Sequence, residues 1–238
     1  QDYDDFQLVV VDSGSTDRTM DIVSQYPCKI LHVAATSYFP GSVLNMAMEQ
    51  SDGEIIVFQN SDVVQLNRHA LGRLVAAFDD DDISAAYARQ VPRPEAWGFV
   101  RRDYDVSFPP NENRPSWITL SLPFAAMRKS VWETRQFYTD AWASEDTEWG
   151  KWAEENNHLI KYVHDAVVMH SHNYTLRQMY GRRFVEGEAD AFIYESGDSL
   201  FEMVTRLVRS TGGDWKYQIK NGLFSEASYT PVRRFVYQ

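Results

Sequence analysis

Residues 9–17 of the chain read Val-Val-Val-Asp-Ser-Gly-Ser-Thr-Asp, and this stretch decides the fold class. Residues 6–11 form a short apolar run with three consecutive valines, which is typical of a strand buried on both faces. Residues 12–17 are rich in turn residues that also cap helices, and residues 18–26 place apolar side chains at helical spacing. The stretch therefore predicts a strand, a tight turn and a helix, the opening unit of an α/β fold.

The alternation continues to about residue 92. Alternating strands and helices imply right-handed crossovers, so we expect a Rossmann-like, mostly parallel sheet flanked by helices. The chain then enters a proline-rich stretch that we expect to be irregular, followed by C-terminal helices. The expected strands are 29–34, 54–59, 83–90, 118–126, 160–163 and 166–169, and the expected helices are 41–51, 66–78, 129–134, 146–156, 176–194 and 200–210. This pattern predicts three parts: 1–92, 93–175 and 176–238.

Composition limits the partners. The formal net charge is −11 and the pI is near 5.0, which argues against a nucleic-acid partner, because such a partner needs a basic surface. A nucleotide ligand stays compatible with this charge if a divalent metal neutralises it locally. A single cysteine, Cys28, suits a reducing compartment, and no apolar run reaches the ~20 residues of a membrane helix. We therefore expect a cytoplasmic location, and Gln1 suggests a chain cut at its start.

Two acidic side chains follow expected strands. Asp12 comes after the first strand and Asp62 after the third. In parallel α/β sheets, ligands bind beyond the carboxyl ends of the strands, where a carboxylate accepts hydrogen bonds from a nucleoside or holds a metal on a diphosphate. Each residue alone could equally be a helix cap.

Two further groups carry chemistry. His170 and His172 end an apolar strand and point to the same face of it, so either one could ligate Mn²⁺ or Mg²⁺, or both could be plain polar residues at a strand end. Glu145 and Asp146 open a helix, whose N-terminus favours ionised carboxylates. They are either a capping pair or a general base with its neighbour. Arg177, Arg182 and Arg183 lie on a basic helix that either contacts the diphosphate or the acceptor, or is a solvated face.

The ordered set of motifs resembles glycosyltransferase family 2, with its GT-A fold, over roughly residues 6–190. The resemblance rests on the opening motif, on Phe-Gln-Asn-Ser-Asp at 58–62, and on Ala-Ser-Glu-Asp at 143–146, with the histidines downstream. Pro40, Gly41 and Asn45 lie between the first two motifs. Residues 170–187 resemble the bacterial rhamnosyltransferase-like branch.

The resemblance implies roles for individual residues. It implies a nucleotide site at Asp12, Ser13, Ser61 and Asp62, a metal site at Asp62, His172 and His170, with His172 slightly preferred, and catalysis by Asp146 as base with Glu145 on the acceptor. The sequence departs from the family where Asn60 and Ser61 replace acids of many members, and the family's opening strand is missing.

The implied activity is transfer of a sugar, with inversion, from a UDP- or dTDP-sugar to a glycan or lipid-linked acceptor, using Mn²⁺ or Mg²⁺. Such an acceptor is compatible with association at the inner face of the membrane. Two alternatives stay open: a sugar-nucleotide pyrophosphorylase, and a non-catalytic family member that binds carbohydrate. The sequence has no Gly-rich phosphate loop, which disfavours the pyrophosphorylase.

Overall fold

The computed structural model describes residues 1–140, 142–195, 197 and 199–237. The predicted strand, turn and helix are present as β1 (Val9–Asp12), a turn and α1 (Thr19–Val23). The next strand is β2 (Lys29–His32). β1 and β2 pair in parallel and form a two-stranded sheet of their own. A short 3₁₀ turn, Ala35–Ser37, leads into α2 (Pro40–Glu49), which starts with proline at its first helical position.

The central sheet has five strands in the order β3-β6-β5-β7-β4. β6 is antiparallel to both of its neighbours, β5 and β7 are parallel, and β4 is antiparallel to β7. Three strands, β3, β5 and β7, therefore run in the same direction. The strands are β3 (Ile55–Gln59), β4 (Val64–Gln65), β5 (Ile83–Val91), β6 (Phe124–Arg128) and β7 (Leu159–Met169).

The α/β class is confirmed, but the central sheet is mixed where the sequence analysis expects a mostly parallel one. β6 lies between β3 and β5 and runs in the opposite direction. The segment before β6 does not show the regular alternation of strands and helices from which parallel strands are predicted, so the sequence did not indicate this direction. β7 is one strand where two were expected. Its pairing register shifts between Ala88 and Arg89, so residues 164–166 form an irregularity in a continuous strand.

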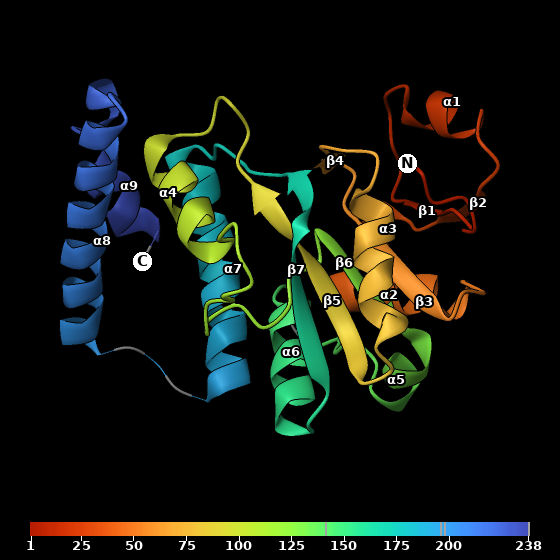
Figure 1. Cartoon of the computed structure of the whole chain (residues 1–238). Coiled ribbons are helices and arrows are strands. Elements are labelled where there is room, and N and C mark those ends of the chain that lie inside the picture. The colour runs from red at the N-terminus through yellow and green to blue at the C-terminus, as the bar shows by residue number, and fades with distance from the viewer. Residues whose placement is uncertain (141, 196, 198, 238) are drawn as a thin grey trace.

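Helices cover both faces of the central sheet (Figure 1), and alternate residues of its strands enter two separate cores. Ala85 and Tyr87 of β5 pack with Trp149 of α6 on one face, whereas Ala86 and Ala88 pack with Leu74 of α3 on the other. The helices of this part are α3 (Ala70–Val75, continued by a 3₁₀ turn at Ala76–Asp79), α5 (Lys129–Thr134), α6 (Glu145–Glu155) and α7 (Leu176–Tyr194).

The stretch 92–123 is not irregular throughout, because α4 (Gly98–Ser107) lies within it. This helix is held by distant partners: Arg102 lies 3.1 Å from buried Asp214, and Asp103 pairs with buried Arg234 at 2.5 Å. Those partners come from α8 (Leu200–Lys220), longer than expected, and α9 (Thr230–Tyr237), which follows a 3₁₀ turn at Phe224–Glu226. No helix among the described residues is both long and apolar enough to cross a membrane.

Candidate functional site

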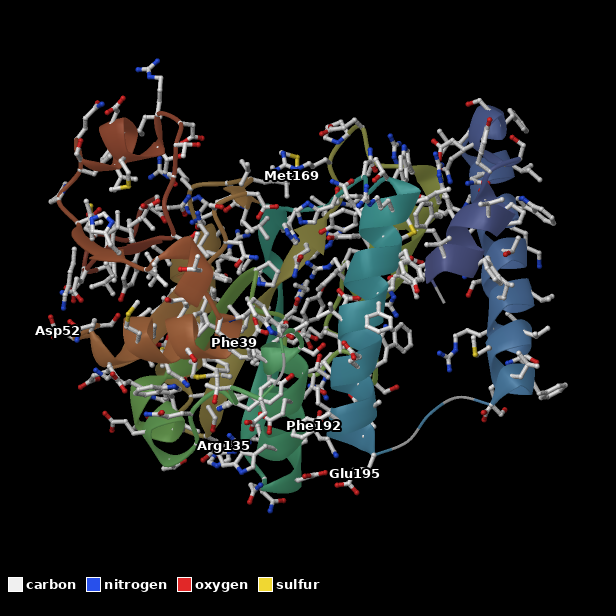
Figure 2. The ribbon with its side chains drawn as sticks, turned by 180° about the vertical axis from the view of Figure 1, so that it is seen from behind. Phe39, Asp52, Arg135, Met169, Phe192 and Glu195 are labelled. Atoms are coloured by element: carbon white, nitrogen blue, oxygen red, sulfur yellow. The ribbon has the colours of Figure 1, made fainter. Side chains whose placement is uncertain are left out.

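The candidate site lies where β3, β5 and β7 end at the same edge of the sheet. Because these strands share a direction, the loop after β3 brings Asp62, the end of β5 brings Gln90, and the end of β7 brings His170 and His172. Figure 2 shows Met169 at this end of β7, with Phe192 and Glu195 at the far end of α7. Arg93 donates a 2.5 Å hydrogen bond to the backbone oxygen of Asp62 and so ties the first loop to β5.

Asp62, His170 and His172 form a cluster of potential metal ligands whose donor atoms all lie within 4.8 Å of one another. The Oδ2 atom of Asp62 is 3.5 Å from Nε2 of His170 and 3.2 Å from Nε2 of His172. Both Asp62 Oδ2 and His170 Nε2 are shielded from solvent and have no hydrogen-bond partner. Buried polar atoms without partners cost free energy unless another ligand satisfies them.

Burial sets the protonation state of the two histidines. It lowers the pKa of His170 to about 4, and it lowers the pKa of His172, against the opposing charge of Asp62. Both rings are therefore neutral at neutral pH, which is the form that binds metals.

Each ring is also held in place from outside the cluster. Nδ1 of His170 lies 2.8 Å from Oε1 of buried Gln90, whose amide nitrogen donates to Ser121. His172 stacks on Tyr174, with ring centroids 5.0 Å apart. Such outer contacts fix the orientation of metal-binding histidines.

Glu145 and Asp146 stand at the start of α6, directly after Ser144, which has a positive φ of 65°. Both oxygens of Asp146 accept backbone hydrogen bonds, Oδ2 from Leu122 at 3.2 Å and Oδ1 from Thr147 at 2.9 Å. Burial raises the pKa of Asp146, and burial together with the neighbouring carboxylate raises the pKa of Glu145 to about 7. The pair is thus a desolvated acidic group, a common property of catalytic sites.

Arg182 of α7 connects the two groups electrostatically. Its positive charge adds to the burial that lowers the pKa of His170 and His172. The same charge partly offsets the burial that raises the pKa of Glu145 and Asp146, so Arg182 lies within electrostatic reach of all four. Its guanidinium bonds Glu186 at 2.7 Å and lies 5.9 Å from the centre of the Tyr174 ring.

The arginines of α7 differ in their surroundings. Arg182 and Arg183 line a cavity of about 250 Å³ together with Asn60, His170 and His172, whereas Arg177 is exposed and does not line it. The basic helix was predicted either to contact the diphosphate or the acceptor or to be a solvated face. Arg182 and Arg183 border the cavity, although the Arg182 side chain is 59% exposed, and Arg177 does not border it.

Asp12 occupies a different place. Its carboxylate is 8% exposed and accepts hydrogen bonds from the amides of Gly14 and Ser15, both at 3.1 Å. Hydrogen bonds from the side chain and backbone of Ser15 lower its pKa. Asp12 ends β1 of the two-stranded sheet, whereas Asp62 follows β3 of the central sheet. The two carboxylates therefore do not follow strands of one and the same sheet, although the strand pattern predicted that they would. Ser13 and Ser61 are exposed.

Gly41 and Asn45 hold α2 against the segment that leads to Glu145. The side-chain amide of Asn45 donates to the backbone oxygen of Phe137 and accepts from the backbone nitrogen of the same residue. Its oxygen also accepts from the indole nitrogen of Trp132. A Cβ at Gly41 would lie 1.9 Å from the backbone oxygen of Tyr138. The resemblance included both residues, and their roles here are structural.

Three tryptophans, Trp97, Trp117 and Trp142, differ in their exposure. Arg233 covers Trp97 at 3.7 Å from the ring centre, so Trp97 packs within the protein. Trp117 and Trp142 are 63% and 61% exposed, and Trp142 lies 5.0 Å from the Phe39 ring, near the Glu145 pair in sequence.

The fold is shared with GT-A glycosyltransferases. A mannosyltransferase from Pyrobaculum calidifontis, solved with GDP-Man and Mn²⁺, matches with a TM-score of 0.65 at 17% identity, over 97% of this chain and 75% of that one. Residues 1–349 of Staphylococcus aureus TarS with UDP match with a TM-score of 0.55 at 17% identity, over 99% and 82%. Glucosyl-3-phosphoglycerate synthase from Mycobacterium tuberculosis, with Mn²⁺ and UDP, matches with a TM-score of 0.57 at 19% identity, over 81% and 70%.

The sequence defines the family. The protein-family model described as Glycosyl transferase family 2 matches residues 1–135, which is more than half of the 238 residues. The chain belongs to this family, as the motif set predicts.

The chain is also similar in sequence to two curated proteins. O-antigen chain rhamnosyltransferases of Salmonella anatum and Salmonella typhimurium are 28% and 27% identical over 193 and 194 residues, which is 76% of this chain in each case. The match spans 61% and 62% of the length of those relatives.

Proposed function

We propose that this chain transfers a sugar from a nucleoside-diphosphate donor to the hydroxyl of an acceptor. The observation that carries the proposal is the cluster of Asp62, His170 and His172 beside the cavity, with two shielded donor atoms that lack hydrogen-bond partners. Family membership supports it, and so do the structural relatives solved with GDP-Man, UDP and UDP-GlcNAc.

The residues of the cluster fit a divalent metal ion. One carboxylate and two neutral imidazoles form a mixed oxygen and nitrogen set, which suits Mn²⁺ better than Mg²⁺. Asp62, His170 and His172 would hold the ion, and two structural relatives were solved with Mn²⁺. When bound, such an ion supplies positive charge that stabilises a departing diphosphate.

Arg182 would act on the same leaving group. Its guanidinium is positioned by Glu186 and Tyr174, and it borders the cavity beside both histidines. A preorganised cation stabilises charge that develops as the bond to the diphosphate breaks.

Asp146 is our candidate for the general base. In the proposed step the acceptor oxygen forms a bond to the anomeric carbon, the bond between that carbon and the diphosphate oxygen breaks, and the acceptor proton passes to Asp146. The two backbone amides hold its carboxylate in one orientation and favour its ionised form. Glu145 would hydrogen-bond the acceptor, and attack from the opposite face would invert the anomeric centre.

For the donor we propose a dTDP- or UDP-sugar, with rhamnose as the first sugar to test, because the matched curated relatives are O-antigen chain rhamnosyltransferases. The acceptor would then be a growing polysaccharide or a lipid-linked glycan, used in the cytoplasm or at the inner face of the membrane. In this proposal Asp12 and Ser13 border the nucleoside end of the donor site, and Asp62 with Ser61 the diphosphate end.

The test is release of nucleoside diphosphate from dTDP- and UDP-sugars in the presence of Mn²⁺. We expect release that depends on the metal and is abolished in Asp62→Ala, with unchanged thermal unfolding of the metal-free variant. A pyrophosphorylase would instead release pyrophosphate from a nucleoside triphosphate and a sugar 1-phosphate. A non-catalytic carbohydrate-binding chain would bind glycan and release neither product, and either result would refute the proposal.

A further inference from the structure

The outer face of α8 carries large apolar side chains that remain exposed. Phe201, Val204, Val208 and Ile219 are 80%, 51%, 66% and 60% exposed. Their spacing places them on one side of the helix. Figure 1 shows α8 at one edge of the molecule, with α4 and α9 on its inner side.

The inner face of the same helix is polar. Its buried residues are Thr211, Asp214 and Gln218. Asp214 pairs with Arg102 and Arg234, and Gln218 bonds the hydroxyl of Thr230. A surface helix of a globular protein normally buries its apolar side, so α8 is reversed. Large apolar side chains gathered on the exposed face of a helix indicate a surface that receives a partner.

The charge on α8 identifies the kind of partner. Arg206, Arg209, Lys216 and Lys220 are exposed, against a single exposed acid, Glu202. This basic helix stands out in a chain with a net charge of −11. Large apolar side chains on one side and lysine and arginine residues beside them are the features of helices that lie in the interface of an anionic membrane.

We propose that α8 docks parallel to an anionic lipid surface, with its apolar stripe inserted among the lipids and its basic side chains on the headgroups. The stripe from Phe201 to Ile219 is ~27 Å long at the α-helical rise. A second copy of the chain fits this face less well, because two such helices packed on each other would bring like charges together. This inference does not depend on the proposed transferase activity.

The test is co-sedimentation of the 238-residue chain with phosphatidylglycerol-containing vesicles and with pure phosphatidylcholine vesicles, without nucleotide or metal. We expect binding to the anionic vesicles that weakens with added salt, and at least tenfold weaker binding to the neutral ones. The variant Phe201→Asp/Val208→Asp should lose at least tenfold in binding, and so should Arg209→Glu/Lys216→Glu.

Phe6→Asp is the matched control, because Phe6 is also exposed, at 58%, but belongs to the N-terminal part of the chain. It should bind vesicles like the original chain, and circular dichroism should show that all variants fold. Absence of vesicle binding, or equal binding by the Phe201→Asp/Val208→Asp variant, would overturn the proposal. So would dimerisation in light scattering that this variant abolishes, because the face would then belong to a second copy.

Discussion

The Nδ1 atom of His170 lies 2.8 Å from Oε1 of Gln90, and Nε2 of the same ring lies 3.5 Å from Asp62. Because the amide oxygen of Gln90 can only accept a hydrogen bond, Nδ1 of His170 carries the proton. Nε2 is then left with a free lone pair directed at the cluster. Gln90 thus determines which nitrogen of His170 is able to bind a metal.

Substitution of Gln90 should therefore weaken metal binding without removing a ligand. We expect Gln90→Met to lower the affinity for Mn²⁺ by about 10–100-fold, measured by calorimetry. Ser84→Ala is the matched control, since Ser84 is also buried on β5 but bonds His158 away from the cluster. Unchanged Mn²⁺ affinity in Gln90→Met would show that this residue has no orienting role.

The two carboxyl groups of α6 should differ in their effects on turnover. Asp146→Asn removes the proposed base and should lower kcat by about 10²–10⁴-fold while donor binding is retained. Glu145→Gln should mainly raise the KM of the acceptor. Glu155→Gln, at the exposed end of the same helix, should leave both constants unchanged. If Glu145→Gln lowers kcat more than Asp146→Asn, the two roles must be exchanged.

Glu145 should also make stability depend on pH. Burial and Asp146 raise its pKa from 4.5 to about 7, so the folded chain holds this proton more tightly than the unfolded chain. The free energy of unfolding should therefore fall as pH rises from about 4.5 to about 7, and this contribution should be constant above that range. Denaturant unfolding of Glu145→Gln should show a smaller fall over the same interval. An identical slope in both proteins would contradict the raised pKa.

Arg182 should act on the donor and not on the fold. We expect Arg182→Gln to reduce kcat/KM for the donor by ~10²-fold, as seen when one preorganised stabilising group is removed. Arg177→Gln tests the same helix at an exposed position outside the cavity and should have little effect. Equal losses in the two variants would indicate a general effect of charge on α7.

Gly41 should be essential for stability. Gly41→Ala places a methyl group against the backbone oxygen of Tyr138, at 1.9 Å before relaxation, and should destabilise the fold by ~1–3 kcal/mol. Gly181→Ala, in the interior of α7 with open space around it, should instead stabilise by ~0.5–1 kcal/mol. Thermal unfolding of the two variants in opposite directions would support this packing. A stable Gly41→Ala variant would contradict it.

The elements that sequence reasoning predicted best are those with local signals. The strands predicted at 6–11 and 54–59 are found at 9–12 and 55–59, and the helices predicted at 129–134 and 176–194 are found with those bounds. α4 was missed because its partners are distant in the sequence: Arg102 and Asp103 pair with residues more than 100 positions away. The insertion of β6 between β3 and β5 has no local signal either. The division of the chain at residues 92 and 175 stays a prediction.

The same distinction applies to the site. The resemblance to glycosyltransferase family 2 implied a shared metal site at Asp62, His170 and His172, and the fold brings the three side chains together. Gln90 ends an ordinary strand in the sequence, so its hydrogen bond to His170 could not be anticipated. The roles proposed for Asp12, Glu145 and Asp146 stay predictions, and the carboxylate of Asp12 is already engaged by its own loop.

The central claim is that Asp62, His170 and His172 hold the metal through which a nucleoside diphosphate binds. Its most direct test is calorimetric titration of dTDP and UDP into the chain with and without Mn²⁺, repeated with Asp62→Ala. We predict binding in Mn²⁺ that becomes at least about tenfold weaker when the metal is omitted or the carboxylate is removed. Equal affinity under all three conditions would contradict the claim.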